Sequence, residues 1–261
     1  NMGINRISIG LQTTNNNLLQ EIGRIHKYED FLSTYEMARN VGFENINVDL
    51  IISLPNQTLV DVEDSINKIV LLNPEHVSVY SLILEEKTKL YSLIENKLLK
   101  MHDDDLERKM YWNAKNKLEE AGYIHYEISN FAKKGFECRH NLDCWEQKEY
   151  IGYGLGAHSY IDNTRFCNTS NIDEYMKVCK IINEVQTDYT KMQEYVMLGL
   201  RKINGISIKK FNRKFGINIY DVFKDELIKL FYYNLLEEKD NIIKLTYKGI
   251  DLANIVWEEF V

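Results

Sequence analysis

Two short stretches that alternate between apolar and polar residues constrain the fold of this chain more than any other feature. In Asn5–Gln12 the apolar residues Ile7, Ile9 and Leu11 alternate with polar residues or glycine, and Asn45–Ile51 repeats the pattern. A period of two indicates a β-strand, because successive side chains of a strand point to opposite faces of the sheet. Each stretch therefore predicts a strand with one apolar and one polar face.

Helical patterns separate these strands from each other and from two later ones. Alternating strands and helices are typical of βαβ units and a parallel sheet, so we expect an α/β fold. Gly42 and Pro74 follow two of the helical patterns and favour helix ends, whereas Thr58 has the chemistry of an N-cap. The predicted elements are strand Asn5–Gln12, a helical stretch broken near Gly23 that resumes over Lys27–Asn40, strand Asn45–Ile51, helix Val60–Leu72, strand His76–Ile83, a helix from Asp103 or Asp104 to Gly122, and strand Tyr123–Ser129.

The polar faces of the first two strands distinguish them from strands of a doubly wound sheet, which are apolar on both faces. A polar face on a parallel strand is expected where the sheet lines a barrel with a bound ligand. Gln12 and Asp49 end the two alternations, and the C-terminal ends of barrel strands carry active sites; alternatively, both residues cap the following turns. Four units cannot close an eight-stranded barrel. Either the sheet is small and open or the chain lacks an N-terminal part, and the half-polar strands favour the second. We therefore expect a partial (β/α) barrel whose N-terminal part is missing.

The segment Cys138–Tyr160 concentrates cysteine, histidine and glycine without a clear helical or strand period. Such irregular segments often place functional side chains. Gly152, Gly154 and Gly156 lack the spacing of a dinucleotide fingerprint, but they allow the backbone to approach a flat ligand or a neighbouring segment closely. We predict a functional loop here.

Cys138, His140 and Cys144 suggest two further functions for this segment, a zinc site and a heme site. Their spacing matches no common zinc site, and only His158 offers a local fourth ligand. His140 could instead be the axial ligand of a heme iron, with Trp145 beside the macrocycle. A lone histidine is more often structural, so the residues alone leave zinc, heme and a structural role open.

The C-terminal part predicts a separate module. After a hairpin over Ser159–Ile161 and Arg165–Asn168 and a helix over Ile172–Ile182, the chain has the order helix, helix, helix, hairpin, helix, which is the plan of a winged helix. The module has a cluster of large apolar and aromatic residues in its third helix. This cluster favours a helix that packs against other parts of a protein over a helix that binds DNA. Thr190–Val261 carries 12 Lys and Arg against 10 Asp and Glu, and this near-neutral charge argues against nucleic-acid binding. The expected elements are helices Lys191–Lys202, Ser207–Phe215 and Tyr220–Leu236, a hairpin over Leu235–Lys239 and Asn241–Thr246, and a closing helix to Phe260; the expected cluster is Phe231, Tyr232, Tyr233, Leu235 and Leu236.

Composition agrees with a globular protein that we expect in the cytoplasm. The chain has 44% hydrophobic and 27% charged residues, a net charge of -7 and no apolar run long enough to span a membrane. The four cysteines are too few for a disulfide framework, which predicts free thiols. We divide the chain into a partial barrel (1–135), a connecting segment (136–189) and a winged-helix-like domain (190–261).

Taken together, these residues resemble the oxygen-independent coproporphyrinogen III oxidase family of radical S-adenosylmethionine proteins, and within it the heme chaperone branch. The resemblance runs from about Gly3 to the C-terminus, and the order and spacing of its motifs are specific. The matching motifs are Arg6-Ile-Ser-Ile-Gly-Leu-Gln12, Gly23-Arg-Ile-His26, Val48-Asp-Leu-Ile-x-x-Leu-Pro55, Ser78-Val-Tyr-Ser-Leu82, Tyr126-Glu-Ile-Ser-Asn-Phe-Ala132, Glu137-Cys-Arg-His-Asn141 and Gly154-Leu-Gly-Ala-His-Ser-Tyr160.

The resemblance implies two sets of site residues. For S-adenosylmethionine it places Gln12 and Asp49 near the ribose, Arg24 near the carboxylate and the backbone of Ile83 near the adenine. For heme it implies a His-Asn-x-x-Tyr-Trp motif, which includes His140, Asn141 and Trp145 here, with Cys144 in the place of the tyrosine. Since true coproporphyrinogen oxidases lack this histidine motif, a heme chaperone is favoured over the decarboxylase.

One motif of that family is absent from these 261 residues. The C-x-x-x-C-x-x-C run, which holds a [4Fe-4S] cluster in the intact relatives, does not occur. We expect a truncated member that performs no radical chemistry. The expected partners are heme or a porphyrin and a heme-accepting protein, and the edge of the first strand is expected to be unpaired, so that it can form a dimer. The alternatives are anaerobic oxidation of coproporphyrinogen III and, from another class, a winged-helix interaction or DNA-binding protein.

Overall fold

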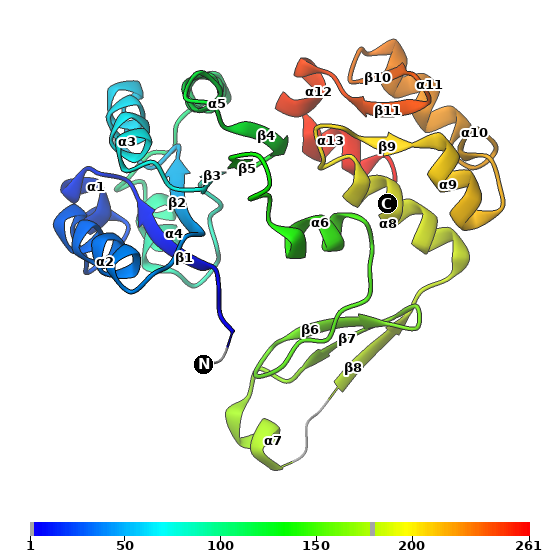
Figure 1. Ribbon diagram of the computed structural model, residues 1–261. Coiled ribbons are helices and arrows are strands. Elements are labelled where there is room, and N and C mark those ends of the chain that lie inside the picture. The colour runs from blue at the N-terminus through cyan, green and yellow to red at the C-terminus, as the bar shows by residue number, and fades with distance from the viewer. Residues whose placement is uncertain (1–2, 178–180) are drawn as a thin grey trace. The chain divides into compact units, whose positions relative to one another are not determined.

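The computed structural model describes residues 3–177 and 181–261, and for residues 181–184 it describes the backbone alone (Figure 1). The chain forms two compact units, Asn1–Glu137 and Cys138–Val261. Each unit has its own sheets and its own buried side chains, and the two are described separately.

The first unit is built on a five-stranded sheet in the order β1-β2-β3-β5-β4. Strands β1 (Ile7–Gln12), β2 (Ile46–Ile52) and β3 (His76–Ser81) are parallel, as the sequence predicts. Among the described residues β1 pairs only with β2, so it forms one edge of the sheet. Whether this edge forms a dimer stays a prediction.

The prediction of a fourth parallel strand over Tyr123–Ser129 is wrong in two respects: the strand is shorter, and it does not pair with β3. It is split into β4 (Ile124–Glu127) and β5 (Asn130–Ala132), and the antiparallel β5 lies between β3 and β4. The buried Glu127 carboxylate accepts hydrogen bonds from the backbone N–H of Ser129, at 2.9 Å, and from the side chain of Asn130. These contacts stabilise a tight turn, which reverses the chain where the sequence pattern alone suggests one continuous strand.

Five helices accompany this sheet. Thr58 caps α3 as predicted, in a reciprocal arrangement with Asp61, and Asp103 caps α5. One helix, α4, lies in a stretch expected to be a loop, where the hydroxyl of Thr88 accepts the backbone N–H of Tyr91 at 3.1 Å. The helices are α1 (Asn16–Glu21), α2 (Tyr28–Asn40), α3 (Leu59–Leu72), α4 (Lys89–Glu95) and α5 (Asp104–Glu120).

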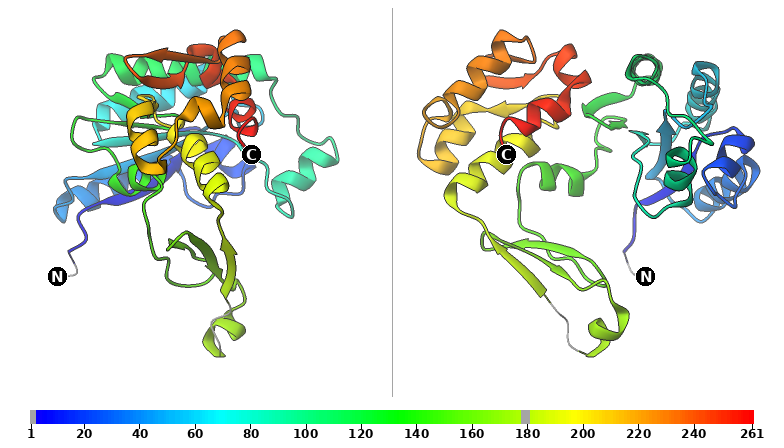
Figure 2. Two further views of the ribbon diagram at one scale, coloured as in Figure 1. Left: turned by 90° about the vertical axis from the view of Figure 1, so that its right-hand side faces the viewer. Right: turned by 180° about the vertical axis from the view of Figure 1, so that it is seen from behind.

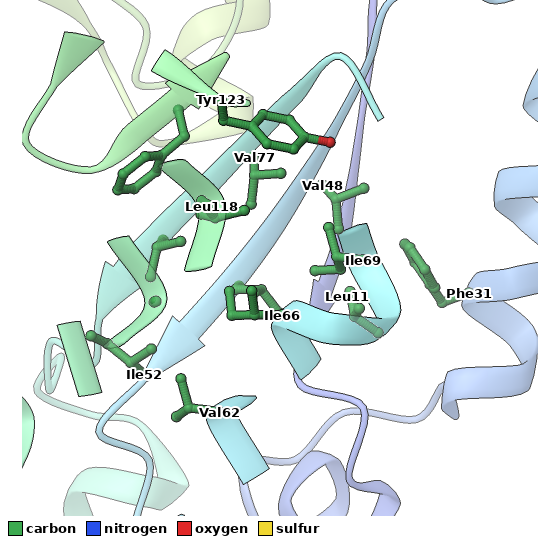
Figure 3. Close-up of a cluster of buried hydrophobic side chains, with 14 of the residues drawn as sticks. Leu11, Phe31, Val48, Ile52, Val62, Ile66, Ile69, Val77, Leu118 and Tyr123 are labelled. Carbon is green, nitrogen blue, oxygen red and sulfur yellow. The ribbon is translucent and has the colours of Figure 1, made fainter. Parts of the chain in front are cut away.

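The core of the first unit lies between one face of the sheet and helices α2, α3 and α5 (Figure 3). Leu11, Val48 and Val77 project from the three parallel strands, and Ile66 and Leu118 meet them from α3 and α5. All five side chains are fully buried. The apolar half of each alternating strand is therefore used for packing, and the polar half lies on the opposite face.

The second unit begins with a short helix, α6 (Arg139–Trp145), and a three-stranded antiparallel sheet. The sheet contains the predicted hairpin, β6 (His158–Ile161) and β7 (Thr164–Asn168), and a third strand, β8 (Ile181–Val185). The helix predicted over Ile172–Ile182 is shorter than expected: α7 spans Ile172–Lys177 and lies at one end of the sheet (Figure 2). Residues 178–180 lie outside the described residues, and the chain then pairs with β7, which satisfies its backbone groups as a strand.

The rest of the second unit has the winged-helix order of elements. Its core is aromatic, with Phe211, Phe223 and Phe260 fully buried and in ring contact. No helix in the described part of the chain is long and apolar enough to cross a membrane. The elements are α8 (Asp188–Gly199), β9 (Ile206–Ser207), α9 (Ile208–Phe215), α10 (Ile219–Val222), α11 (Lys224–Tyr232), β10 (Leu236–Lys239), β11 (Ile242–Leu245), α12 (Tyr247–Asp251) and α13 (Ala253–Glu258).

The aromatic cluster predicted in the third helix of this module packs only in part. Leu235 and Leu236 are buried, but they follow α11 and begin the hairpin. Tyr232 and Tyr233 are 83% and 51% exposed, which contradicts a packing role for them. Tyr232 is the last residue of α11, and Tyr233 is its C-cap.

Candidate functional site

The polar face of the first-unit sheet carries a row of hydrogen-bonding side chains. Ser8 of β1, Asn47 and Asp49 of β2, and His76 and Ser78 of β3 share this face. The strand register aligns Asp49 with Gly10 on one side and with Ser78 on the other. Gly10, the register partner of Asp49, has no side chain, and the amide of Gln12 occupies the space that a Cβ at Gly10 would take.

Gln12 is the last residue of β1, as predicted, and adopts a left-handed conformation with φ 72°. A bulge between Gly10 and Gln12 shifts the register here. A Cβ at Gly10 would lie 2.6 Å from Nε2 of Gln12, so glycine at this position leaves room for the Gln12 side chain as it is observed. The prediction that Asp49 ends its strand is wrong, because β2 continues for three residues to Ile52.

Arg24 and Ile83 come from the loops after α1 and β3. The ring Nε2 of His26 lies 3.3 Å from the carbonyl oxygen of Leu11, which brings the loop that carries the exposed Arg24 to the C-terminal end of β1. Ile83 follows β3 by two residues, its side chain is 83% exposed, and its backbone groups have no hydrogen-bond partner among the described residues. Gln12 and Ile83 thus lie at the C-terminal ends of β1 and β3, the strands on either side of β2, and the loop of Arg24 reaches the end of β1.

The second set of predicted residues lies on α6, where the sequence showed no helical period. His140 is exposed, and its Nε2 lies 3.9 Å from Sγ of Cys144, one helical turn further on. The His140 ring also meets the edge of Tyr150, with centroids 6.4 Å apart. Asn141 is half-buried, and its side-chain amide makes no hydrogen bond with another described residue.

Trp145 does not share the face of His140 and Cys144. Its ring packs on the guanidinium of Arg201, 4.4 Å from the ring centroid, and the same guanidinium lies 4.6 Å from the centroid of Trp257. Cation–π contacts of one guanidinium with two indoles restrict the orientation of the Arg201 side chain and of both indoles. Trp145 therefore anchors α6 to the winged-helix module and leaves His140 exposed.

The glycine-rich loop after α6 is held by backbone contacts. A Cβ at Gly152 would lie 2.2 Å from the carbonyl oxygen of His158, so two chain segments meet there at a distance that only glycine permits. Gly154 and Gly156 have φ 98° and 64°, in the region that favours glycine. The predicted close approach is confirmed at Gly152, where the partner is a neighbouring chain segment.

Some residues of these sites were not predicted from the sequence. The sequence of β3 also alternates, with His76, Ser78 and Tyr80 between valines, and this signal could have identified its polar face. Arg201 had no sequence signal, because its role depends on two tryptophans that lie far from it in the chain.

Comparison with known proteins defines the class. Residues 1–69 match the model of the Radical SAM superfamily, and residues 187–252 match the HemN C-terminal domain. The solved structure of coproporphyrinogen III oxidase (HemN) from Escherichia coli aligns with a TM-score of 0.81 at 19% identity, over 99% of this chain and 64% of that one. At this identity the alignment shows a shared fold, with the parallel strands of a radical SAM domain followed by a winged-helix-like module.

Curated relatives identify the branch of that class. The chain is 40% identical to the heme chaperone HemW of Bacillus subtilis (strain 168), over 99% of this chain and 70% of the relative. It is 37% identical to the heme chaperone HemW of Lactococcus lactis subsp. lactis (strain IL1403), over 99% of this chain and 69% of the relative. The chain therefore belongs to the HemW family of heme chaperones, and it spans about 70% of the length of these two members.

Proposed function

We propose that this chain binds heme on helix α6, with His140 as the axial ligand of the iron, and that it acts as a heme chaperone. The exposed imidazole of His140, on a helix that Trp145 and Arg201 hold in place, is the observation that supports this proposal. A neutral imidazole on a fixed helix can approach a metal without reorganising the backbone. Asn141 offers an unused amide for a polar group of the ligand. The heme would then pass to an accepting protein.

A heme titration of the full 261-residue chain tests this proposal. Wild type should shift the Soret band with saturable binding, and His140→Ala should weaken binding by about tenfold or more, a loss of about 1.4 kcal/mol. His158→Ala is the matched control, because His158 is also exposed and lies in the same unit. Equal affinities of wild type and His140→Ala would contradict the assignment of His140.

We propose a second site, for S-adenosylmethionine, on the polar face of the first unit. Gln12 and Asp49 would bind the ribose, Arg24 the carboxylate, and the backbone of Ile83 the adenine. Three observations support the fit: the Gln12 amide that lies over Gly10 (the register partner of Asp49), the unpartnered backbone groups of Ile83, and the contact that brings the Arg24 loop to β1. A carboxylate that accepts ribose hydroxyls is a common way to bind a nucleoside.

Binding of labelled S-adenosylmethionine, measured by equilibrium dialysis, tests this second site. Asp49→Asn keeps the shape of the side chain and removes its charge, so we expect a loss of about tenfold or more, as for hydrogen bonds to charged groups. Asp162→Asn, at an exposed turn of the second unit, is the control. A dissociation constant that Asp49→Asn leaves unchanged would exclude the carboxylate from the site.

The residues present do not fit a [4Fe-4S] cluster, which the family implies for radical chemistry. Cys138, Cys144, Cys167 and Cys179 do not have the C-x-x-x-C-x-x-C spacing. Across residues 3–177 and 181–261, no three His, Cys, Asp or Glu side chains converge on a metal-sized site. We therefore derive no radical step for these 261 residues, and we expect no 5'-deoxyadenosine from them after incubation with iron and sulfide.

A further inference from the structure

Asn47 lies at the centre of the polar face and touches four of its side chains. Its Nδ2 lies 2.8 Å from Oδ1 of Asp49 and 3.2 Å from Oγ of Ser8. Its Oδ1 lies 2.6 Å from Nδ1 of His76 and 3.1 Å from Oγ of Ser78. Asn47 is 4% exposed, so these contacts replace water as its hydrogen-bond partners.

The direction of each hydrogen bond in this group is fixed by its chemistry. An ionised Asp49 can only accept, so the Asn47 amide nitrogen must face it and the Asn47 oxygen must face His76. Burial lowers the pKa of His76 to about 3, and the positive charge of Arg6 adds to this effect, so the imidazole is neutral and has a single N–H. That N–H is at Nδ1, where it donates to Asn47, and Nε2 accepts from the hydroxyl of Tyr126 at 2.8 Å.

A one-way chain of hydrogen bonds therefore runs from Tyr126 through His76 and Asn47 to Asp49. Tyr126 is the first residue of a motif that the proposed ligand contacts do not use. Its hydroxyl selects the tautomer of His76, which in turn selects the orientation of the Asn47 amide. Buried chains of this kind orient the group at their end and strengthen each other.

We propose that Asn47 is a positioning residue for Asp49: it holds Oδ1 of the carboxylate and leaves Oδ2 to accept a ribose hydroxyl, and His76 and Tyr126 set the direction of this contact. The inference rests on the proposed S-adenosylmethionine site. It goes further because it assigns the specificity for ribose hydroxyls to residues that do not touch the ligand.

Discrimination between adenosine and 2',3'-dideoxyadenosine, as competitors of labelled S-adenosylmethionine, tests this inference in the full chain. Wild type should prefer adenosine by about tenfold or more, since hydrogen bonds to a carboxylate contribute about 1.5–3 kcal/mol. Asp49→Asn and Asn47→Ala should both reduce this preference, and the double variant should lose little more than either single one, because the two residues act as one unit. Tyr126→Phe, which keeps the ring and its packing, should reduce the preference in part.

The control is Asn113→Ala. Asn113 of α5 also donates from Nδ2 to a carboxylate at 2.8 Å, that of Glu63, but it lies on the helical side of the sheet. Asn113→Ala should therefore keep the preference for adenosine. Two results would overturn the positioning role. In the first, Asn47→Ala weakens the binding of both nucleosides equally. In the second, a folded Tyr126→Phe variant keeps the full preference for adenosine. If wild type bound no S-adenosylmethionine, the proposed site itself would fail, which is a different result.

Discussion

The Nε2 atom of His140 and the Sγ atom of Cys144 lie 3.9 Å apart on one face of helix α6. This distance places a thiol beside the imidazole that we propose as the axial ligand of heme. The resemblance to the heme chaperone branch implies a tyrosine at the position of Cys144, and a thiol is smaller than a phenol.

Cys144 should react slowly with iodoacetamide. Burial raises the pKa of the Cys144 thiol, the charge of Asp143 adds to the rise, and Arg165 opposes it. Since the thiolate is the reactive form, alkylation at about pH 8 should be slower than in the denatured chain and should rise steeply above that pH. Mass spectrometry of the peptide that contains Cys144 gives the rate. Added heme should slow it further, because the ligand would cover both side chains; equal rates in the folded and denatured chain would contradict the raised pKa.

Arg201→Ala should destabilise the second unit by about 1–3 kcal/mol, because it removes cation–π contacts to Trp145 and Trp257 together. Urea unfolding followed by tryptophan fluorescence measures this change. Arg201→Lys should recover only part of it, since an ammonium group cannot stack as a plane between two indoles.

The matched control for this prediction is Arg213→Ala, because Arg213 is exposed on α9 of the same unit. Its free energy of unfolding should stay within about 0.5 kcal/mol of wild type. Since Trp145 anchors α6, Arg201→Ala should also weaken heme binding. If Arg201→Ala lost stability but bound heme as tightly as wild type, the contact of Trp145 with Arg201 would not be needed for heme binding.

Gly152→Ala should cost more stability than a substitution at Gly156. The new Cβ would lie 2.2 Å from the His158 carbonyl oxygen, which belongs to the backbone and cannot rotate away, so we expect a loss of about 1–3 kcal/mol or more. Gly156→Asn is the comparison, because Gly156 has φ 64°, which asparagine tolerates, and no atom within 4 Å of its Cβ position. Thermal unfolding of both variants measures the difference, and equal losses would argue against the close approach.

The two faces of the first-unit sheet could be predicted from the sequence, because the alternation in β1 and β2 depends only on neighbouring residues. Gln12 could be identified as a candidate site residue because it ends the first of these alternations. The chain of hydrogen bonds to Asp49 could not, since His76 is 29 residues from Asn47 and Tyr126 is 50 residues from His76. Its members meet only when the strand order is known.

The second unit shows the same limit. The hairpin β6–β7 has a local signal, whereas the helix expected over Ile172–Ile182 ran into the first two residues of β8. The pairing of β8 with β7 joins residues that are not adjacent in the chain. The turn after β4 was missed because Glu127, a poor strand former on average, stabilises it through backbone contacts that no pattern of hydrophobic residues reveals.

Acid should destabilise the first unit through two buried histidines. Burial lowers the pKa of His76 to about 3 and that of His125 to about 4, from an ordinary value of 6.5. Below pH 6.5 the unfolded chain therefore binds protons that the folded chain does not, so the free energy of unfolding falls as the pH falls. Each histidine contributes a slope of about 1.4 kcal/mol per pH unit between its two pKa values.

His125→Gln isolates one of these contributions. Carboxylates also titrate in this range, so the comparison is between variants: His125→Gln should reduce the slope near pH 5 by about 1.4 kcal/mol per pH unit, because it removes one proton-binding group. The exposed His158 provides the control, because His158→Gln makes the same substitution at a solvent-exposed position. Urea unfolding at several pH values, followed by circular dichroism, measures both. Parallel curves for wild type and His125→Gln would show that His125 is protonated in the folded chain.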